Sequence, residues 1–138
     1  MNLRAAFELP LVVASEDIDT NGHVNNVVYL GWVQDVAIAH WRAAIAQKAW
    51  PRAKEIAWVV RKHAIEYLRP AFAGEALLAR TWAEPAGAAT FHRHTEISRP
   101  ADDQLLARAE SLWVVLDARS GRPRRLDAEL RALFAAPK

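Results

Sequence analysis

The chain contains 138 residues, of which 52% are hydrophobic and 25% are charged, and it has no cysteine. This length is typical of one domain, so we expect residues 1–138 to form a single domain around one core. Without cysteine the protein has no disulfide, no cysteine-ligated zinc and no thiol nucleophile. Its chemistry must therefore use carboxylates, imidazoles, hydroxyls or the backbone. No apolar stretch approaches the length of a membrane span and no signal peptide is evident, which predicts a cytoplasmic protein without membrane contacts.

The charge of the chain is nearly balanced, with 18 basic residues against 16 acidic ones and a net charge of +2. The two signs are interspersed, whereas a nucleic-acid-binding protein normally carries a basic stripe, so we expect no nucleic-acid partner. The one dense basic cluster comprises Arg119, Arg122, Arg124 and Arg125. We interpret it first as a solvated turn, and only then as a site for a small phosphorylated ligand or a nucleic-acid contact.

The first third of the chain predicts a strand followed by a long helix. Residues 7–14 are apolar and favour extended structure, and Pro10 places this strand near a sheet edge or a bulge. After a polar segment, about twenty residues carry apolar side chains at helical spacing and predict a helix that ends before Pro51. The stripe expected to face the core consists of Leu30, Val33, Ala37, Trp41 and Ile45.

The rest of the chain predicts four consecutive strands and a short helix. The strands are expected at residues 56–68, 76–84, 88–98 and 105–117, and the helix at 127–134 with Asp127 as its cap. Strands joined by tight turns pair antiparallel, and a helix with one apolar stripe packs against one face of the sheet. The sequence therefore predicts an α+β fold in which a curved antiparallel sheet wraps one central helix.

The polar segment before the long helix concentrates the groups that can carry chemistry. It reads Asp17-Ile18-Asp19-Thr20-Asn21-Gly22-His23-Val24-Asn25-Asn26. Its opening matches an EF-hand calcium loop, but the position that requires a bidentate Glu is Val28 and the preceding element is a strand, which disfavours calcium. A structural interpretation is that Asn25 or Asn26 caps the helix while Gly22 adopts a positive φ.

A catalytic interpretation accounts for the alternate spacing of Asp19, Asn21 and His23 beside one helix end. A helix N-terminus presents unpaired backbone N–H groups that can hold a carbonyl oxygen as it becomes an oxyanion. Asp19 could attack an acyl carbon or deprotonate a water, and Asn21 and His23 could orient the carboxylate or the water. The residues alone leave the structural and catalytic interpretations open.

Residues 17–32 resemble the D-x-D-x-N-x-H-V-N-N-x-x-Y-x-x-W signature of hotdog-fold acyl thioesterases. The signature is shared by acyl-ACP thioesterases and by bacterial acyl-CoA thioesterases of the 4-hydroxybenzoyl-CoA type. The resemblance implies a hotdog fold and hydrolysis of an acyl-CoA or acyl-ACP thioester to the free acid and thiol, without a cofactor. A dehydratase or hydratase on the same fold, and a catalytically silent acyl-CoA-binding protein, remain the alternatives.

The resemblance also implies roles for particular residues. Asp19 matches the nucleophile or general base, Asn21 and His23 match its polar partners, and the backbone N–H near Asn26 matches the oxyanion donor. Tyr29 belongs to the same motif and is expected to contact the substrate. Hotdog thioesterases form dimers with sites at the subunit interface, which implies a homodimer or a homotetramer.

Cationic residues of the predicted strands are candidates to bind the carrier of the acyl group. Arg61, Lys62, Arg69 and Arg93 could meet the phosphates of CoA or the acidic surface of a carrier protein. A solvated strand face is the alternative for each of them.

Two histidines on one predicted strand raise the question of a metal site. His92, His94 and Glu96 alternate and so share one strand face, and a His-x-His pair on a strand can bind a metal. Because the sequence shows no further ligand, we predict a solvated or interface face and no metal.

Asp35 is expected to give structural support, and His40 to lie on a helix flank without a function.

Overall fold

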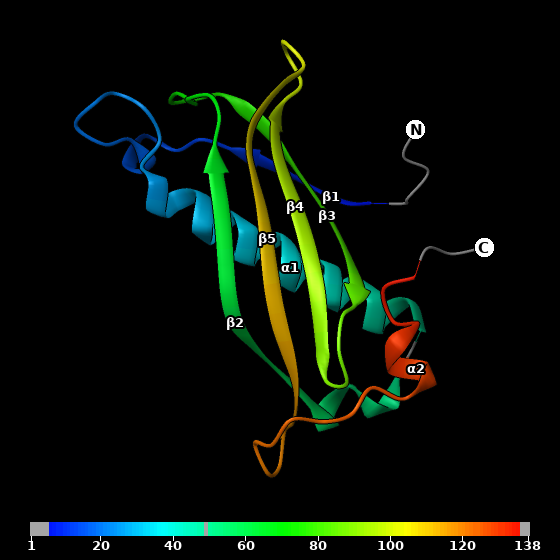
Figure 1. The fold of residues 1–138 in the computed structure, drawn as a ribbon. Helices are drawn as coiled ribbons and strands as arrows, with labels where there is room; N and C mark the ends of the chain where they lie inside the picture. The colour runs from blue at the N-terminus through cyan, green and yellow to red at the C-terminus, as the bar shows by residue number, and fades with distance from the viewer. Residues whose placement is uncertain (1–5, 49, 136–138) are drawn as a thin grey trace.

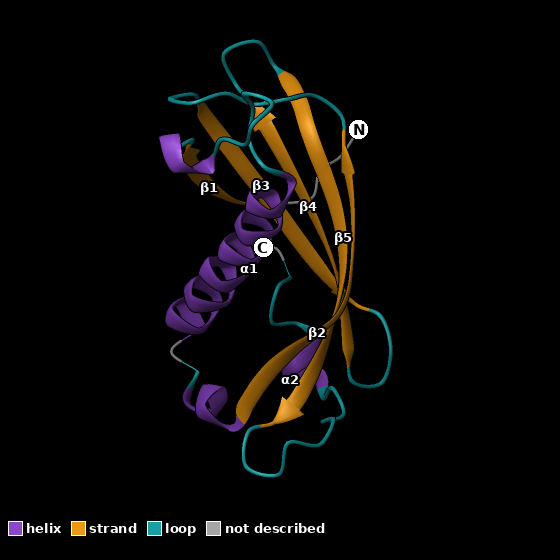
Figure 2. Ribbon diagram, turned by 90° about the vertical axis from the view of Figure 1, so that its left-hand side faces the viewer, coloured by secondary structure: helices purple, strands orange, loops and turns teal. Residues whose placement is uncertain are grey.

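The computed structural model describes residues 6–48 and 50–135. Its elements are β1 (Phe7–Val12), the 3₁₀ turn η1 (Ser15–Asp17), α1 (Asn26–Lys48), the 3₁₀ turn η2 (Pro51–Glu55), β2 (Ile56–Tyr67), β3 (Ala76–Pro85), β4 (Thr90–Arg99), β5 (Gln104–Asp117) and α2 (Ala128–Arg131). The five strands form one antiparallel sheet in the order β1-β3-β4-β5-β2. Figure 1 shows α1 crossing one face of this sheet, and Figure 2 shows the sheet curving around the helix. The predicted α+β architecture is confirmed.

Most predicted elements are found within a few residues of their expected ends. Pro10 lies on β1, which is an edge strand as predicted, so its missing N–H costs the sheet no internal hydrogen bond. The last helix ends at Arg131 and is shorter than expected. Its cap is as predicted, because Asp127 Oδ1 accepts a hydrogen bond from the backbone N–H of Leu130 at 2.9 Å.

The predicted core stripe of α1 is only partly correct. Val33 and Ala37 are buried as expected, whereas Leu30, Trp41 and Ile45 are only half-buried. The side chains of α1 that are buried are Tyr29, Trp32, Val33, Val36, Ala37 and Ala44. Apolar residues occupy nearly every face of this helix, so their spacing does not define the face that packs on the sheet.

The basic cluster near Gly121 forms the turn that follows β5. Asp117 Oδ1 accepts hydrogen bonds from the backbone N–H groups of Arg119 and Ser120, at 2.9 and 2.8 Å, and Gly121 has a φ of +73°. Arg124 forms an ion pair with Glu55 at 2.9 Å. The interpretation as a turn is therefore confirmed.

The second edge of the sheet is β2, which runs for twelve residues and pairs only with β5 in the described part of the chain. A β-bulge interrupts its pairing between Val60 and Lys62. Val59 and Tyr67 of this strand are 48% and 45% exposed. Unpaired edges of this length are available for pairing with another chain.

Within the described residues, no helix combines the length and the apolar character that crossing a lipid bilayer requires.

Candidate active site

The polar segment before α1 forms a closed loop that begins and ends at a β-bridge between Ile18 and Val24. The backbone N–H of Asp19 donates to the carbonyl of His23 at 2.9 Å, and that of Gly22 donates to the carbonyl of Asp19 at 3.1 Å. Gly22 has a φ of +85°, which glycine adopts without the strain that a side chain would cause. The predicted positive φ is confirmed, and the loop holds Asp19 and His23 side by side.

The carboxylate of Asp19 is oriented by the loop backbone. Its Oδ1 accepts a hydrogen bond from the N–H of Asn21 at 2.8 Å. The same oxygen lies 4.0 Å from Nδ1 of His23, which is too long for a hydrogen bond but close enough for an ion pair when the imidazole is protonated. The side chains of Asp19 and His23 are 24% and 38% exposed. Asn21 thus orients Asp19 through its backbone, and its exposed side chain makes no contact with the carboxylate among the described residues.

The helix that follows the loop begins at Asn26, and Asn25 is its cap. Oδ1 of Asn25 accepts from the N–H of Val27 at 3.1 Å, and its carbonyl accepts from the N–H of Val28 at 2.9 Å. Of the two predicted caps, Asn25 is therefore the one that the structure shows. The N–H of Asn26 is at the first helical position, where backbone donors have no acceptor within the helix. This donor and the positive end of the helix dipole suit a developing negative charge.

A hollow of about 240 Å³ opens beside the start of α1. It is lined by His23, Val24, Asn26, Tyr29, Tyr67, Leu68, Arg69 and Pro70. The structure thus brings four candidate residues, His23, Asn26, Tyr29 and Arg69, to one surface, while Asp19 and Asn21 occupy the adjoining loop outside the lining. The sequence interpretation missed Tyr67, whose hydroxyl donates to the carbonyl of Asn26 at 3.1 Å. Its place at the end of a long strand gave no signal of this contact.

Tyr29 forms the inner wall of the hollow. It is only 3% exposed and packs edge-on against both Trp32 and Tyr67. Burial raises the pKa of its hydroxyl above the ordinary value, because the phenolate form loses its hydration. Tyr29 is therefore a neutral side chain whose contact with a substrate is limited to the small part that faces the hollow.

Comparison with known families identifies the chain. The family model of the thioesterase-like superfamily matches residues 13–134, which include the loop, α1 and the strands β2 to β5. The chain belongs to the thioesterase-like superfamily. No functionally curated protein matches it at a significant level.

Solved structures show that this superfamily member has the hotdog fold. The probable thioesterase YbaW from Escherichia coli is 22% identical with a TM-score of 0.82, and the match covers 94% of this chain and 99% of that one. A 1,4-dihydroxy-2-naphthoyl-CoA thioesterase from Synechocystis is 21% identical with a TM-score of 0.79 and coverages of 94% and 96%. A hypothetical protein from Staphylococcus aureus, solved in complex with CoA, is 15% identical with a TM-score of 0.78 and coverages of 96% and 84%.

The cationic candidates of this thioesterase-like protein are not gathered at one place. Arg69 lines the hollow. Arg61 and Lys62 are exposed at the bulge of the edge strand β2, and Lys62 stands opposite Leu112 of β5. Their predicted contact with phosphates stays a prediction.

Arg93 is buried in the structure. It is 4% exposed and contacts His40 of α1, so the alternative of a solvated strand face is wrong for this residue, while its predicted contact with phosphates stays a prediction. Its Nη1 donates to Nδ1 of His40 at 2.9 Å and to Oγ1 of Thr81 at 3.0 Å. Its guanidinium also stacks 4.8 Å from the ring centre of Phe134 and lines an apolar cavity of about 50 Å³. Burial lowers the pKa of Arg93 to about 10.

His40, which was expected on a helix flank without a function, makes this internal contact with Arg93. Its ring stacks on Phe7 and lies tilted against Phe134, with ring centres 5.1 and 4.7 Å away. Burial, together with the neighbouring positive charge of Arg93, lowers its pKa to about 3, so it accepts the hydrogen bond from Arg93 as a neutral imidazole. Asp35, by contrast, is exposed on α1, and no described residue supports the structural role expected for it.

One group of side chains among the described residues has the spacing of metal ligands, and it lies on the sheet and not in the polar loop. It is formed by Glu84, His92 and His94. Glu96, which shares their strand face, instead lies 3.6 Å from Nη1 of Arg80. The carboxylate that lies with the two histidines is therefore Glu84 of β3, and not Glu96 of their own strand.

Proposed function

We propose that the protein hydrolyses acyl thioesters at the start of α1, with Asp19 as the general base or nucleophile. The observation that carries the proposal is the loop between Ile18 and Val24, which holds a partly exposed carboxylate next to a helix N-terminus and a hollow. Membership of the thioesterase-like superfamily favours thioester hydrolysis as the kind of reaction.

In the proposed reaction the thioester carbonyl oxygen accepts a hydrogen bond from the N–H of Asn26. Oδ1 of Asp19 is engaged by the N–H of Asn21, so Oδ2 is the oxygen that removes a proton from water or attacks the carbonyl carbon. Negative charge then grows on the carbonyl oxygen and is stabilised by the helix end. On the general-base route, water adds to the carbonyl carbon, the carbon–sulfur bond breaks, and the leaving thiolate takes up the proton that Asp19 removed. On the nucleophile route, the thiolate takes a proton from solvent, and water then hydrolyses the acyl anhydride on Asp19 to release the acid. Nδ1 of His23 lies 4.0 Å from Oδ1 of Asp19, where it is placed to pass a proton on.

The geometry supports a site completed by a second copy of the chain. Tyr67 ends β2, and Arg69 follows two residues later, so the hollow adjoins the unpaired edge of this strand. Pairing of two β2 edges would bring the second chain next to this hollow. We therefore propose a homodimer, or a homotetramer of such dimers, and light scattering that shows an active monomer would contradict it.

The proposed substrate is an acyl-CoA or acyl-ACP. Arg69 at the hollow and Arg61 and Lys62 on the adjoining strand are the cations placed to meet phosphates or an acidic carrier surface. Asn26 stands where the 4-hydroxybenzoyl-CoA type often has an aromatic or apolar residue, which favours a substrate other than an aromatic acyl group.

The experiment that tests the proposal follows thiol release with a chromogenic disulfide reagent over acyl-CoAs from short to long and aromatic. The protein has no cysteine and so adds no background signal. Release that depends on the acyl group, with CoA or carrier-protein thioesters, is the expected result. Binding of acyl-CoA without release from either carrier would show a silent binding protein, and hydration of an enoyl-CoA without release would show a hydratase.

A further inference from the structure

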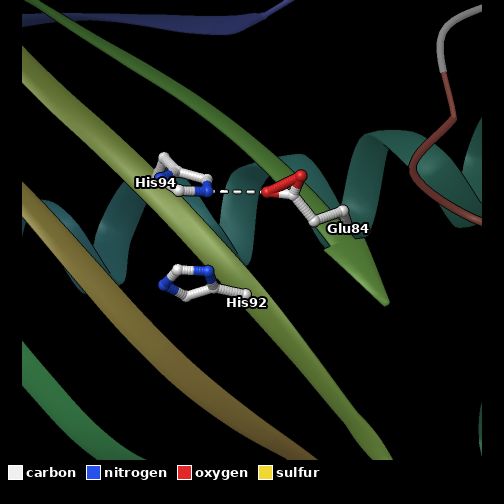
Figure 3. A group of neighbouring side chains, drawn as sticks. All are labelled: Glu84, His92 and His94. Atoms are coloured by element: carbon white, nitrogen blue, oxygen red, sulfur yellow. Dashed lines mark hydrogen bonds and ion pairs between the residues drawn. The ribbon is translucent and has the colours of Figure 1, made fainter. Parts of the chain in front are cut away.

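Four polar side chains meet on the face of the sheet that points away from α1. Glu84 comes from β3, His92 and His94 from β4, and Glu110 from β5. Strand register brings them together, since Glu84 stands opposite His92 and Glu110 stands opposite His94. Figure 3 shows Glu84, His92 and His94 in front of the strands with the helix behind them. This cluster contains none of the residues of the proposed active site.

The distances within the cluster match those between ligands of one metal ion. Nε2 of His94 lies 2.6 Å from Oε1 of Glu84, and Nε2 of His92 lies 3.2 Å from Oε1 of Glu110. One ligand atom from each of Glu84, His92 and His94 lies within 4.8 Å of the others. Ligand atoms around a tetrahedral ion with ordinary Zn–N and Zn–O bonds are about 3.3 Å apart, so small side-chain rotations suffice to place an ion between them.

The packing around the two histidines holds their side chains in place, which favours a defined binding site. The ring of Trp82 stacks on His94 with a centre distance of 5.3 Å and an angle of 15°. The two imidazoles are 4.5 Å apart, centre to centre, on one strand whose neighbours pair with it on both sides. The side chains of His94, His92 and Glu84 are 26%, 37% and 44% exposed, so an ion can reach them from solvent.

Charge balance explains which ion the cluster would take. Two glutamates contribute two negative charges, and imidazoles bind a metal as neutral ligands. Both carboxylates approach His94, because Oε1 of Glu110 lies 3.9 Å from its Nδ1. A divalent cation neutralises both carboxylates at once, and a mixed nitrogen and oxygen ligand set suits zinc and related transition metals better than calcium or magnesium.

We propose that Glu84, His92 and His94, with Glu110 as the fourth partner, bind one divalent transition-metal ion, of which Zn²⁺ fits best. The ion would connect β3, β4 and β5 on the outer face of the sheet. This site is separate from thioester hydrolysis, so its test does not depend on the proposed function.

Isothermal titration calorimetry of the untagged protein with Zn²⁺ alone tests the site. The visible absorption spectrum of bound Co²⁺ reports the number and geometry of the ligands. We expect one Zn²⁺ per chain, and a loss of affinity of at least about tenfold in Glu84→Gln and in His94→Gln. Glu96→Gln is the matched control, because Glu96 has the same charge and lies on the same strand face beside Arg80. It is expected to bind Zn²⁺ as the wild type does.

Circular dichroism and thermal unfolding establish that each variant is folded before its affinity is compared. Absence of Zn²⁺ binding by the wild type would overturn the proposal. Equal weakening by Glu84→Gln and Glu96→Gln would also overturn it, because it would show attraction to surface charge in place of ligation.

Discussion

Two histidines, one just before α1 and one in its second half, are used in opposite ways. His23, before the first turn, is 38% exposed and lies 4.0 Å from a carboxylate oxygen. His40, within the helix, packs against two phenylalanine rings and accepts a hydrogen bond from buried Arg93. The start of α1 leaves polar groups with hydrogen-bonding capacity facing a hollow, whereas the polar groups around His40 are satisfied inside the protein. Chemistry is therefore expected at the start of α1 and stability around His40.

The largest expected effect is on catalysis at the start of α1. Asn26→Pro removes the backbone N–H proposed to bind the oxyanion, while proline is well tolerated at the first position of a helix. We expect kcat for thioester hydrolysis to fall by about 10² to 10³. Asn26→Ala is the control, because it loses the side chain and keeps the N–H. Equal activity of the two variants would show that the N–H of Asn26 does not stabilise the oxyanion.

The region around His40 is tested by the pH dependence of stability. Because the pKa of His40 is about 3 in the folded protein and 6.5 ordinarily, the unfolded chain binds a proton between these values that the folded chain does not. The free energy of unfolding should therefore fall on acidification from pH 6.5 towards pH 3, by at most about 1.4 kcal/mol per pH unit from this group.

His40→Asn keeps an acceptor for Arg93 and removes the titration. Urea unfolding between pH 7 and pH 4 is expected to show a shallower fall in stability for this variant than for the wild type, since all other titrating groups are common to both. Parallel curves would show that His40 is not held neutral in the folded protein.

The smallest expected effects are changes in stability when each of two glycines is replaced by alanine, and each replacement serves as the control for the other. A Cβ added at either Gly22 or Gly31 meets no atom within 4 Å, but only Gly22 has a positive φ. Gly22→Ala should destabilise the loop by about 1 kcal/mol, and Gly31→Ala should stabilise the helix by about the same amount. Thermal unfolding measures both. Changes of the same sign would mean that backbone conformation is not what distinguishes the two positions.

The sequence predicted the helices and strands of this fold well. The spacing of apolar residues changes from helical to alternating where a helix is followed by a strand, and this change can be read from neighbouring residues alone. The loop was also predictable from local sequence, since Gly22 adopts a positive φ and Asn25 caps the helix. Contacts between strands were less accessible, because they depend on register. Glu84 could not be paired with His92, nor Glu110 with His94, until the alignment of β3, β4 and β5 was known.

The buried position of Arg93 illustrates a different limit. Alternation placed it on the same strand face as Phe91 and Thr95, both of which are buried. Its charge nevertheless favoured a surface interpretation, because unpaired arginines are rarely buried. The structure resolves the conflict through His40 and Thr81, which accept its hydrogen bonds from distant parts of the chain.

The most direct test of the account compares thiol release by Asp19→Asn and Asp17→Asn with the preferred acyl thioester. Asp17 is the last residue of η1, directly before the loop, and its Oδ2 accepts from the N–H of Ala14 at 2.9 Å, a contact that asparagine can keep. The account predicts that kcat falls by about 10² to 10⁴ in Asp19→Asn and stays close to the wild-type value in Asp17→Asn, with both variants folded. Hydrolysis by Asp19→Asn at the wild-type rate would contradict it.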